Sequence, residues 1–160
     1  MEVWDLYDDH KNKTGKHCTR GEEIPEDLFH LVVHIWIVND KGEYLISQRS
    51  EKKSLFPLMW ECAGGAVLKD ETSLQAALRE TKEEVNLTII PTKIIHEDSN
   101  LDKIKELIFI RLVYICELKS NIDEITLKED EHSEYKFINT LNDLGNDKVV
   151  PFLEDVFKNI

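Results

Sequence analysis

The stretch from residue 64 to residue 87, GGAVLKDETSLQAALRETKEEVNL, constrains the fold more than any other part of the chain. Thr72 is followed three residues later by Gln75, a capping-box pattern that predicts the start of a helix. Spacing of 3.6 residues predicts one buried stripe along this helix, made of Leu74, Ala77, Leu78, Thr81 and Val85. The sequence therefore predicts a glycine-containing loop that leads directly into an amphipathic helix.

A different face of the same helix carries three carboxylates. Glu80, Glu83 and Glu84 stand at i, i+3 and i+4, where side chains are neighbours and like charges repel. A divalent cation would compensate for this repulsion, because such ions prefer oxygen ligands. Ala76 is expected on this face one turn earlier, leaving space for a ligand. The ordinary alternative is a solvated acidic face, which would not require the nearby Gly64–Gly65 pair or an arginine and a further glutamate at fixed spacing.

With these residues in view, the stretch resembles the Nudix box: Gly, five residues, Glu, seven residues, then Arg-Glu-hydrophobic-x-Glu-Glu-x-Gly-hydrophobic. Two positions depart from the pattern, Thr81 in place of a hydrophobic residue and Asn86 in place of glycine. Asn is the commonest non-glycine residue in the left-handed conformation that ends helices, so we expect a positive φ at Asn86. The matching residues are Gly65, Glu71, Arg79, Glu80, Glu83, Glu84 and Leu87.

The resemblance implies an α+β fold, an α/β/α sandwich with a mixed sheet between helices, here with an N-terminal hairpin extension. It also implies metal-dependent chemistry, with Mg²⁺ or Mn²⁺ as the cofactor. Arg79 would hold the box carboxylates by ion pairing, and Glu71 would brace the junction of loop and helix. The implied metal ligands are Glu80, Glu83, Glu84 and the carbonyl of Gly64.

Residues outside the helix complete the expected site. Many Nudix enzymes recruit a further acid as ligand or base, and Glu131 is the candidate; a surface acidic loop is the alternative. Arg49 and Lys53 follow a predicted strand and could bind substrate phosphates. A salt bridge from Arg49 to the acidic helix is the competing interpretation. Gly65 is expected to bring backbone close to the substrate.

Composition narrows the possible partners. A chain of 160 residues is expected to form one compact domain, and a net charge of −12 argues against a nucleic-acid polymer or an anionic membrane as the main partner. The same charge repels an anionic substrate, so metal ions and basic residues would have to overcome it locally. No signal peptide or membrane-length apolar run is visible, and the three cysteines form no CxxC pair. We therefore expect a cytoplasmic protein.

Along the chain we expect an N-terminal extension over residues 1–29 and the Nudix domain over residues 30–160. The extension would be a hairpin of strands 3–7 and 17–21, whose basic residues suit a solubilising loop better than a substrate-binding flap. Residues 97–103 are predicted as a polar turn, and Pro151 as the start of an apolar terminal helix that could face either the core or a homodimer partner. The expected domain strands cover residues 31–38, 43–49, 88–96, 105–118 and 134–138.

Four further residue types invite functional interpretations. Cys62 resembles a nucleophile by position, but a small buried thiol fits it better, because no histidine base is fixed near it in the sequence. His30 and His34 are expected to be structural. The tryptophans could stack on a base or fill the core. Arg111 needs a partner, either an acid in an ion pair or the substrate.

The favoured function is a metal-dependent pyrophosphohydrolase that cleaves a diphosphate linkage in a nucleoside diphosphate linked to another moiety. One alternative is an isopentenyl-diphosphate isomerase-like enzyme, which the segments 14–15 and 29–31 resemble. The other is a Nudix domain that binds a nucleotide or metabolite without catalysis. The intact box carboxylates weigh against both alternatives.

Overall fold

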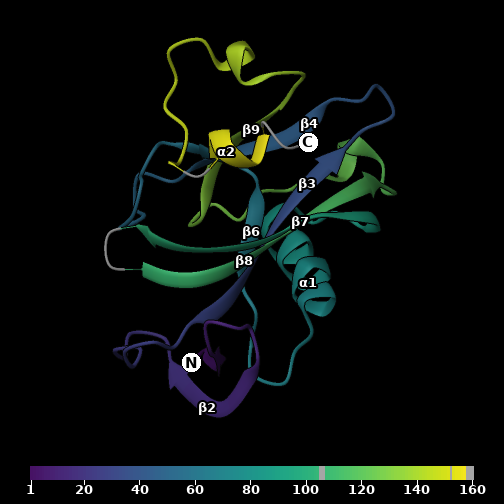
Figure 1. Ribbon diagram of the computed structural model, residues 1–160. Helices are drawn as coiled ribbons and strands as arrows, with labels where there is room; N and C mark the ends of the chain where they lie inside the picture. The colour runs from purple at the N-terminus through teal and green to yellow at the C-terminus, as the bar shows by residue number, and fades with distance from the viewer. Residues whose placement is uncertain (105–106, 152, 158–160) are drawn as a thin grey trace.

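The computed structural model describes residues 1–104, 107–151 and 153–157, with backbone alone at 91–113 and 155–156. A seven-stranded mixed sheet forms its centre (Figure 1). Neighbouring strands follow the path β5-β4-β3-β8-β7, with β6 paired to β3 and β9 paired to β4. β3 and β8 are parallel, and the other pairs are antiparallel. The strands are β3 (His30–Val38), β4 (Tyr44–Arg49), β5 (Trp60–Glu61), β6 (Ala63–Ala66), β7 (Ile89–Ile104), β8 (Leu107–Leu118) and β9 (His132–Ile138).

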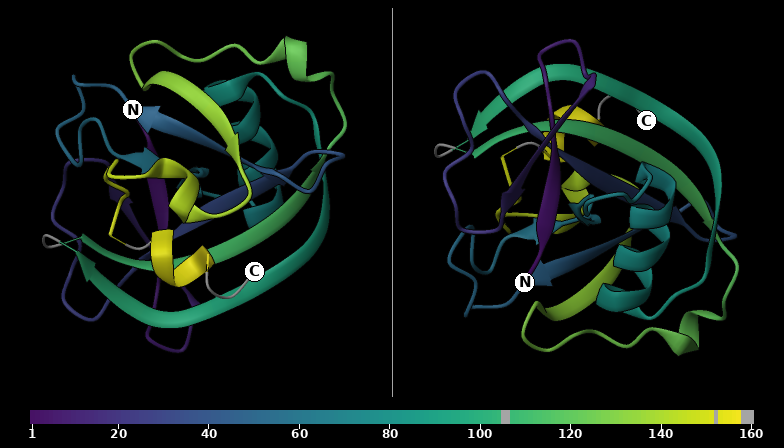
Figure 2. Two further views of the ribbon diagram at one scale, coloured as in Figure 1. Left: turned by 90° about the horizontal axis from the view of Figure 1, so that it is seen from above. Right: turned by 90° about the horizontal axis from the view of Figure 1, so that it is seen from below.

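Both faces of this sheet are buried, each against different helical segments. In β3, Val33 and Ile35 belong to the core that packs against α1 (Ser73–Val85), whereas Trp36 belongs to the opposite core. This alternation follows from the two-residue period of a strand. The second core contains residues of η2 (Leu141–Leu144) and α2 (Leu153–Phe157), so α1 and α2 lie on opposite sides of the sheet (Figure 2). The expected α+β architecture with a mixed sheet between helices is confirmed.

The ends of α1 agree with the sequence. The Thr72 side chain accepts a bond from the Gln75 amide at 3.2 Å, and the Gln75 side chain accepts one from the Thr72 amide at 2.8 Å. At the other end Asn86 has φ 59°, the left-handed value expected there. Thr81 is fully buried and donates its hydroxyl to the Ala77 carbonyl at 2.8 Å. Local side-chain chemistry therefore sets both limits of the helix.

The buried face of α1 differs from the predicted stripe. Leu74 and Leu78 are 43% and 41% exposed, whereas Ala76 is fully buried. The expectation that Ala76 leaves space for a ligand is therefore wrong. The helix approaches the sheet through small residues, Ala76, Ala77 and Thr81, and its leucines are therefore turned toward solvent.

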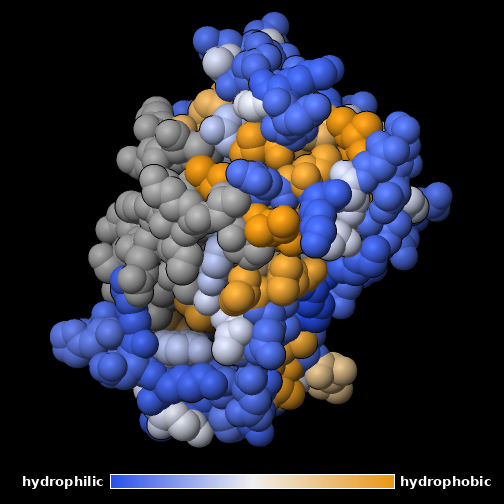
Figure 3. Space-filling view, turned by 90° about the vertical axis from the view of Figure 1, so that its right-hand side faces the viewer, coloured by the Kyte–Doolittle hydropathy of each residue, from blue (hydrophilic) through white to orange (hydrophobic). Residues whose placement is uncertain are grey.

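Apolar patches interrupt the hydrophilic surface on the side of the molecule that faces the viewer in Figure 3.

The N-terminal residues form a separate hairpin of β1 (Val3–Tyr7) and β2 (Lys13–Thr19). β2 begins earlier than the strand predicted for residues 17–21, because the polar stretch from 8 to 12 alone makes the turn. Asp5 is 5% exposed and fastens the hairpin to the loop before α1. Its carboxylate accepts bonds from the Asp70 amide at 2.9 Å and pairs with Lys13 at 2.6 Å and His17 at 3.0 Å.

β7 continues to Ile104, so the turn predicted for residues 97–103 is wrong; β7 ends the main path of the sheet, where polar residues are tolerated in a strand. The side chain of Arg111 lies outside the described residues, as do those of Phe152, Val156 and Ile160, which belong to the apolar face predicted for the terminal helix. Within the described part of the chain, every helix is too short or too polar to cross a membrane.

Candidate functional site

The glycine pair lies in β6, directly against β3 and α1. The Gly64 amide donates to Glu84 Oε2 at 3.1 Å, which ties the loop to the end of the acidic helix. A Cβ on Gly64 would lie 2.3 Å from the Val33 carbonyl oxygen, and one on Gly65 would lie 2.2 Å from Glu80 Oε1. Both positions therefore need glycine because protein atoms approach the backbone closely.

Arg79 connects the loop, the helix start and two carboxylates. Its Nε donates to Glu71 Oε1 at 2.8 Å and its Nη2 to the Ala66 carbonyl at 2.9 Å. Its Nη1 donates to Glu80 Oε1 at 2.7 Å and lies 3.5 Å from the exposed Glu83. Burial raises the pKa of Glu71, but the bonds from Arg79 and the Leu68 amide outweigh it and lower that pKa below its ordinary value. This arrangement can brace the junction between the glycine loop and α1.

Glu84 is the most perturbed acid of the site. Burial raises its pKa well above the ordinary value, and the charges of Glu61, Glu80 and Glu131 add to this effect. The Gly64 amide bond opposes the shift without cancelling it. The carboxylate charges around Glu84 thus add to its burial, and together they outweigh the one bond that stabilises its ionised form, an electrostatic situation in which a bound cation is favourable.

The donor atoms fit a hard divalent cation in kind. Carboxylate and carbonyl oxygens are the ligands that Mg²⁺ and Mn²⁺ prefer. Within the described residues, however, no three acidic, histidine or cysteine side chains already converge on one point. The contacts of Glu80 give the reason, because its carboxylate is engaged by Arg79. Burial also raises the pKa of Glu80; Arg79 opposes this shift, and the charges of Glu83 and Glu2 add to it.

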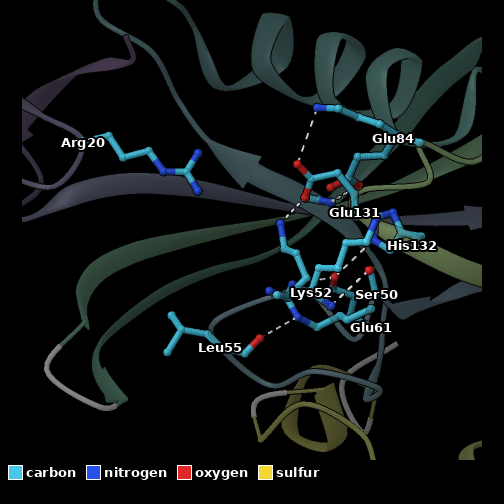
Figure 4. A network of polar contacts seen from close by, with 12 residues as sticks. Arg20, Ser50, Lys52, Leu55, Glu61, Glu84, Glu131 and His132 are labelled. Carbon is cyan, nitrogen blue, oxygen red and sulfur yellow. Dashed lines mark hydrogen bonds and ion pairs between the residues drawn. The ribbon is translucent and has the colours of Figure 1, made fainter.

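The two basic candidates are both engaged by acids. Arg49 donates its Nη1 to both oxygens of Glu61, at 2.7 and 2.8 Å, and not to a carboxylate of α1. Lys53 contacts Glu131, which Lys128 also approaches at 3.5 Å (Figure 4). Burial raises the pKa of Glu131, but the two lysines outweigh it, so the pKa lies below the ordinary value. The structure thus places Arg49 on Glu61 and Lys53 on Glu131, two of the acids whose charges act on Glu84.

Glu61 and His132 belong to the same network, and neither was predicted from the sequence as a site residue. After burial, the charge of Glu61 contributes most to the raised pKa of Glu84. The buried His132 lies with its Nε2 3.2 Å from Glu61 Oε1 (Figure 4). Glu61 had one usable signal, its position three residues before the glycine loop begins at Gly64. His132 had none, because its role depends on strand register.

The hairpin also reaches this region. Glu2 is among the charges that raise the pKa of Glu80, and it pairs with Arg20 at 3.1 Å. In Figure 4 the Arg20 side chain extends from the hairpin toward Glu84 and Glu131.

Other sequence candidates lie in the core. Cys62 is 4% exposed, and burial raises the pKa of its thiol far above the ordinary value. Burial lowers the pKa of His30 to about 4, and its ring stacks on Trp4 at 4.4 Å. Trp36 and Trp60 are fully buried, so neither is accessible to a base. The interpretation of Cys62 as a small buried thiol agrees with these observations.

Comparison with known proteins places this site in a family. An uncharacterised Nudix hydrolase of Listeria innocua is 47% identical over 90 residues, 56% of this chain and 53% of that protein. Among solved structures, the MutT protein of Methanosarcina mazei has TM-score 0.69 and 27% identity, over 81% of this chain and 91% of its own. DR0079 of Deinococcus radiodurans has TM-score 0.76 at 21% identity over 98% of both chains, a likeness of fold.

The extent of these matches differs. The aligned region spans about half the length of the curated Listeria relatives. The family model described as NUDIX domain, in contrast, matches residues 28–160 of this chain. The chain with its glutamate-bearing helix and paired glycines thus belongs to the NUDIX domain family.

Proposed function

We propose that this chain is a metal-dependent pyrophosphohydrolase that cleaves a diphosphate linkage in a nucleoside diphosphate joined to another moiety. The observation that carries the proposal is the position of Glu84. Its buried carboxylate lies against the glycine loop, among the charges of Glu61, Glu80 and Glu131, and two of these acids hold Arg49 and Lys53. Hydrolysis of a diphosphate requires carboxylates that bind a metal ion and, near them, basic side chains that bind phosphate.

In this proposal the cation ligands are Glu80, Glu83, Glu84 and the Gly64 carbonyl, with Mg²⁺ or Mn²⁺ as the ion. When bound, such an ion neutralises phosphate charge and lowers the pKa of coordinated water. Arg79 holds Glu80 in the loop-facing orientation through the 2.7 Å bond described above.

The remaining roles belong to residues outside the box. Arg49 and Lys53 bind phosphate oxygens, and Gly65, which has no side chain, lets the substrate approach the backbone closely. Glu131 is the proposed further acid; its pKa lies below the ordinary value, so the carboxylate is ionised at neutral pH, but its pairing with lysines weakens it as a base. Because Lys53 contacts Glu131, a phosphate that attracts Lys53 would release this carboxylate.

We infer a small-molecule diphosphate as substrate, a cytoplasmic location and a possible homodimer, with neither a nucleic-acid polymer nor a membrane as partner. The net charge of −12 supports the exclusion of polyanions. The division into an extension over 1–29 and a domain over 30–160 is likewise a prediction.

The experiment is phosphate release from a substrate panel with Mg²⁺ or Mn²⁺. The panel contains nucleoside diphosphates and triphosphates, nucleotide sugars, dinucleotides, coenzymes and isopentenyl diphosphate. Turnover should require the metal and disappear in Glu83→Gln and Glu84→Gln. Glu154→Gln, which removes an exposed carboxylate from α2 on the other side of the sheet, should leave it unchanged.

Two outcomes would overturn the proposal. Conversion of isopentenyl diphosphate without phosphate release would indicate an isomerase, which the buried Cys62 with its raised pKa disfavours. Tight binding of one compound without any turnover would indicate a binding domain. In that case Glu84→Gln would leave its signalling function largely intact.

A further inference from the structure

Three adjacent strands meet at the end of β4, and their side chains form a network. β5 and β9 each pair with β4, so Glu61, Arg49 and His132 lie on neighbouring strands. The register of β9 shifts here: Gln48 pairs with Glu134, whereas Arg49 pairs with His132. The shift leaves Ser133 as an extra, unpaired residue. This β-bulge makes His132, and not Ser133, the partner of Arg49 on the neighbouring strand. Bulges of this kind re-aim side chains, and this one brings the histidine to Glu61.

Arg49 is fixed through two of its three guanidinium nitrogens. Its Nε donates to the Leu55 carbonyl at 3.0 Å, and its Nη1 donates to Glu61. Its Nη2 has no partner among the residues that the structure describes. The guanidinium is planar, so fixing two nitrogens also fixes the direction of the third. The side chain is only 16% exposed, which limits its other conformations.

Glu61 is itself held by a second residue. His132 Nε2 donates to Glu61 Oε1 at 3.2 Å, the oxygen that Arg49 Nη1 also contacts, and the histidine side chain is 1% exposed. A carboxylate bound by both a buried imidazole and an arginine cannot rotate freely, so it restricts the plane of the guanidinium. A surface ion pair would not do this, because it would exchange with water.

We infer that Glu61 is a positioning residue that orients Arg49 so that its Nη2 meets a phosphate oxygen of the substrate, with His132 as the support of Glu61. This rests on the proposed function, in which Arg49 binds phosphate. The role differs from that of Glu80 and Glu84, because Glu61 acts through an arginine and not through a bound metal ion. It adds to substrate affinity by preorganisation.

Lys53 provides an internal control. It follows the same strand and serves the same proposed purpose, but Glu131 holds it, not Glu61. An ammonium group is also a point charge without a plane to orient. Loss of Glu61 should therefore leave the contribution of Lys53 unchanged.

The test is a pair of double-mutant cycles on KM and kcat. E61Q should raise KM about tenfold, within the range found when supporting residues of a site are removed, and change kcat less than threefold. In the R49A background E61Q should have no further effect on KM, because the residue it orients is gone. In the K53A background it should again raise KM about tenfold.

Binding of inorganic pyrophosphate in the presence of Mg²⁺, measured by calorimetry on the same variants, gives a second readout. If the wild type turns over nothing on the panel, the proposed hydrolase function fails, whereas these affinities still decide the role of Glu61. An equal loss from E61Q with and without Arg49 would overturn the inference. So would a loss of Mn²⁺ affinity in E61Q that matches its loss of activity. If E61Q does not fold, E61D, which keeps the charge and withdraws it by one methylene, replaces it.

Discussion

The two glycines before α1 allow one chemical change to be compared at neighbouring positions. Gly64→Ala and Gly65→Ala each add a single methyl group, and neither glycine has a φ that an alanine would avoid. The obstacles differ. At Gly64 the methyl would lie 2.3 Å from the backbone oxygen of Val33, and at Gly65 it would lie 2.2 Å from the movable carboxylate of Glu80. The first change should therefore damage the fold, and the second the site.

The magnitudes follow from these contacts. Overfilling at Gly64 pushes β3 away from β6 and should cost about 1–3 kcal/mol. For a chain of this size, that lowers Tm by about 2 to 12 °C. At Gly65 the carboxylate of Glu80 can swing away, losing its bond to Arg79, a partly exposed pair that contributes about 1 kcal/mol. The smaller entropy of the unfolded alanine variant offsets about 0.4–1 kcal/mol of this loss, so Tm should change by no more than about 3 °C.

Activity should show the reverse order. In Gly65→Ala the displaced Glu80 no longer faces the cation site, and we expect kcat to fall about 100-fold together with Mn²⁺ affinity. Thermal unfolding by circular dichroism and phosphate release measure the two effects. In a Glu80→Ala background, which vacates the space, Gly65→Ala should change neither quantity further. Wild-type turnover in Gly65→Ala, or a Tm loss equal to that of Gly64→Ala, would refute the reasoning.

Three further predictions concern stability. Burial raises the pKa of Asp5, but bonds from Lys13 and the Asp70 amide outweigh it, so the pKa in the folded protein lies below the ordinary value of 3.8. The stabilisation that ionised Asp5 gives the folded state is therefore complete above pH 3.8 and disappears as the pH falls through the lower, folded-state pKa. Asp5→Asn should therefore lower Tm at pH 7, and the gap from wild type should close below about pH 3.8 in a pH series of melts; a constant gap would contradict this. Asn86 has φ 59°, and its Nδ2 donates to the Glu124 carbonyl at 3.2 Å, a bond that alanine and glycine variants both lose. Because only alanine is strained at this φ, Asn86→Ala should cost about 1 kcal/mol more than Asn86→Gly in urea unfolding, and equal costs would exclude conformational strain as the cause. Arg79→Ala should cost about 2 kcal/mol by the same measurement, and Arg79→Lys should recover only part, because an ammonium cannot serve two carboxylates and a carbonyl in one plane; full recovery by lysine would show that charge alone matters.

The sequence predicted those parts of the fold that short-range chemistry controls. Thr72 and Asn86 set the ends of α1 through their own side chain and backbone, so the prediction needed no tertiary information. The predicted buried stripe was partly wrong because Leu74 and Leu78 have the right period, but which side of a helix is buried also depends on how closely the sheet approaches. Here the alanines permit a close approach, and Glu80 and Glu84 turn toward β6 as a result.

The site was predicted less completely than the helix. The box spacing predicted Glu80, Glu83 and Glu84 on one face of α1, because neighbouring positions on one helix share a face whatever the rest of the chain does; their role as cation ligands stays a prediction. Glu61 meets Arg49 and His132 only through the pairing of three strands and one register shift. Neither a strand order nor a bulge can be read from residue spacing, so this network could not be predicted.

The network at the end of β4 also limits when the site can form during synthesis. The contact between Glu61 and His132 joins residues 71 apart in the chain, and that between Lys53 and Glu131 joins residues 78 apart. β3 pairs in parallel with β8, so the centre of the sheet also awaits a late segment. A nascent chain therefore carries the complete acidic helix well before it can form the network to which we assign phosphate binding. Arg49 and Glu61 can meet their third partner only after His132 has been synthesised, so we expect this network to form late in folding.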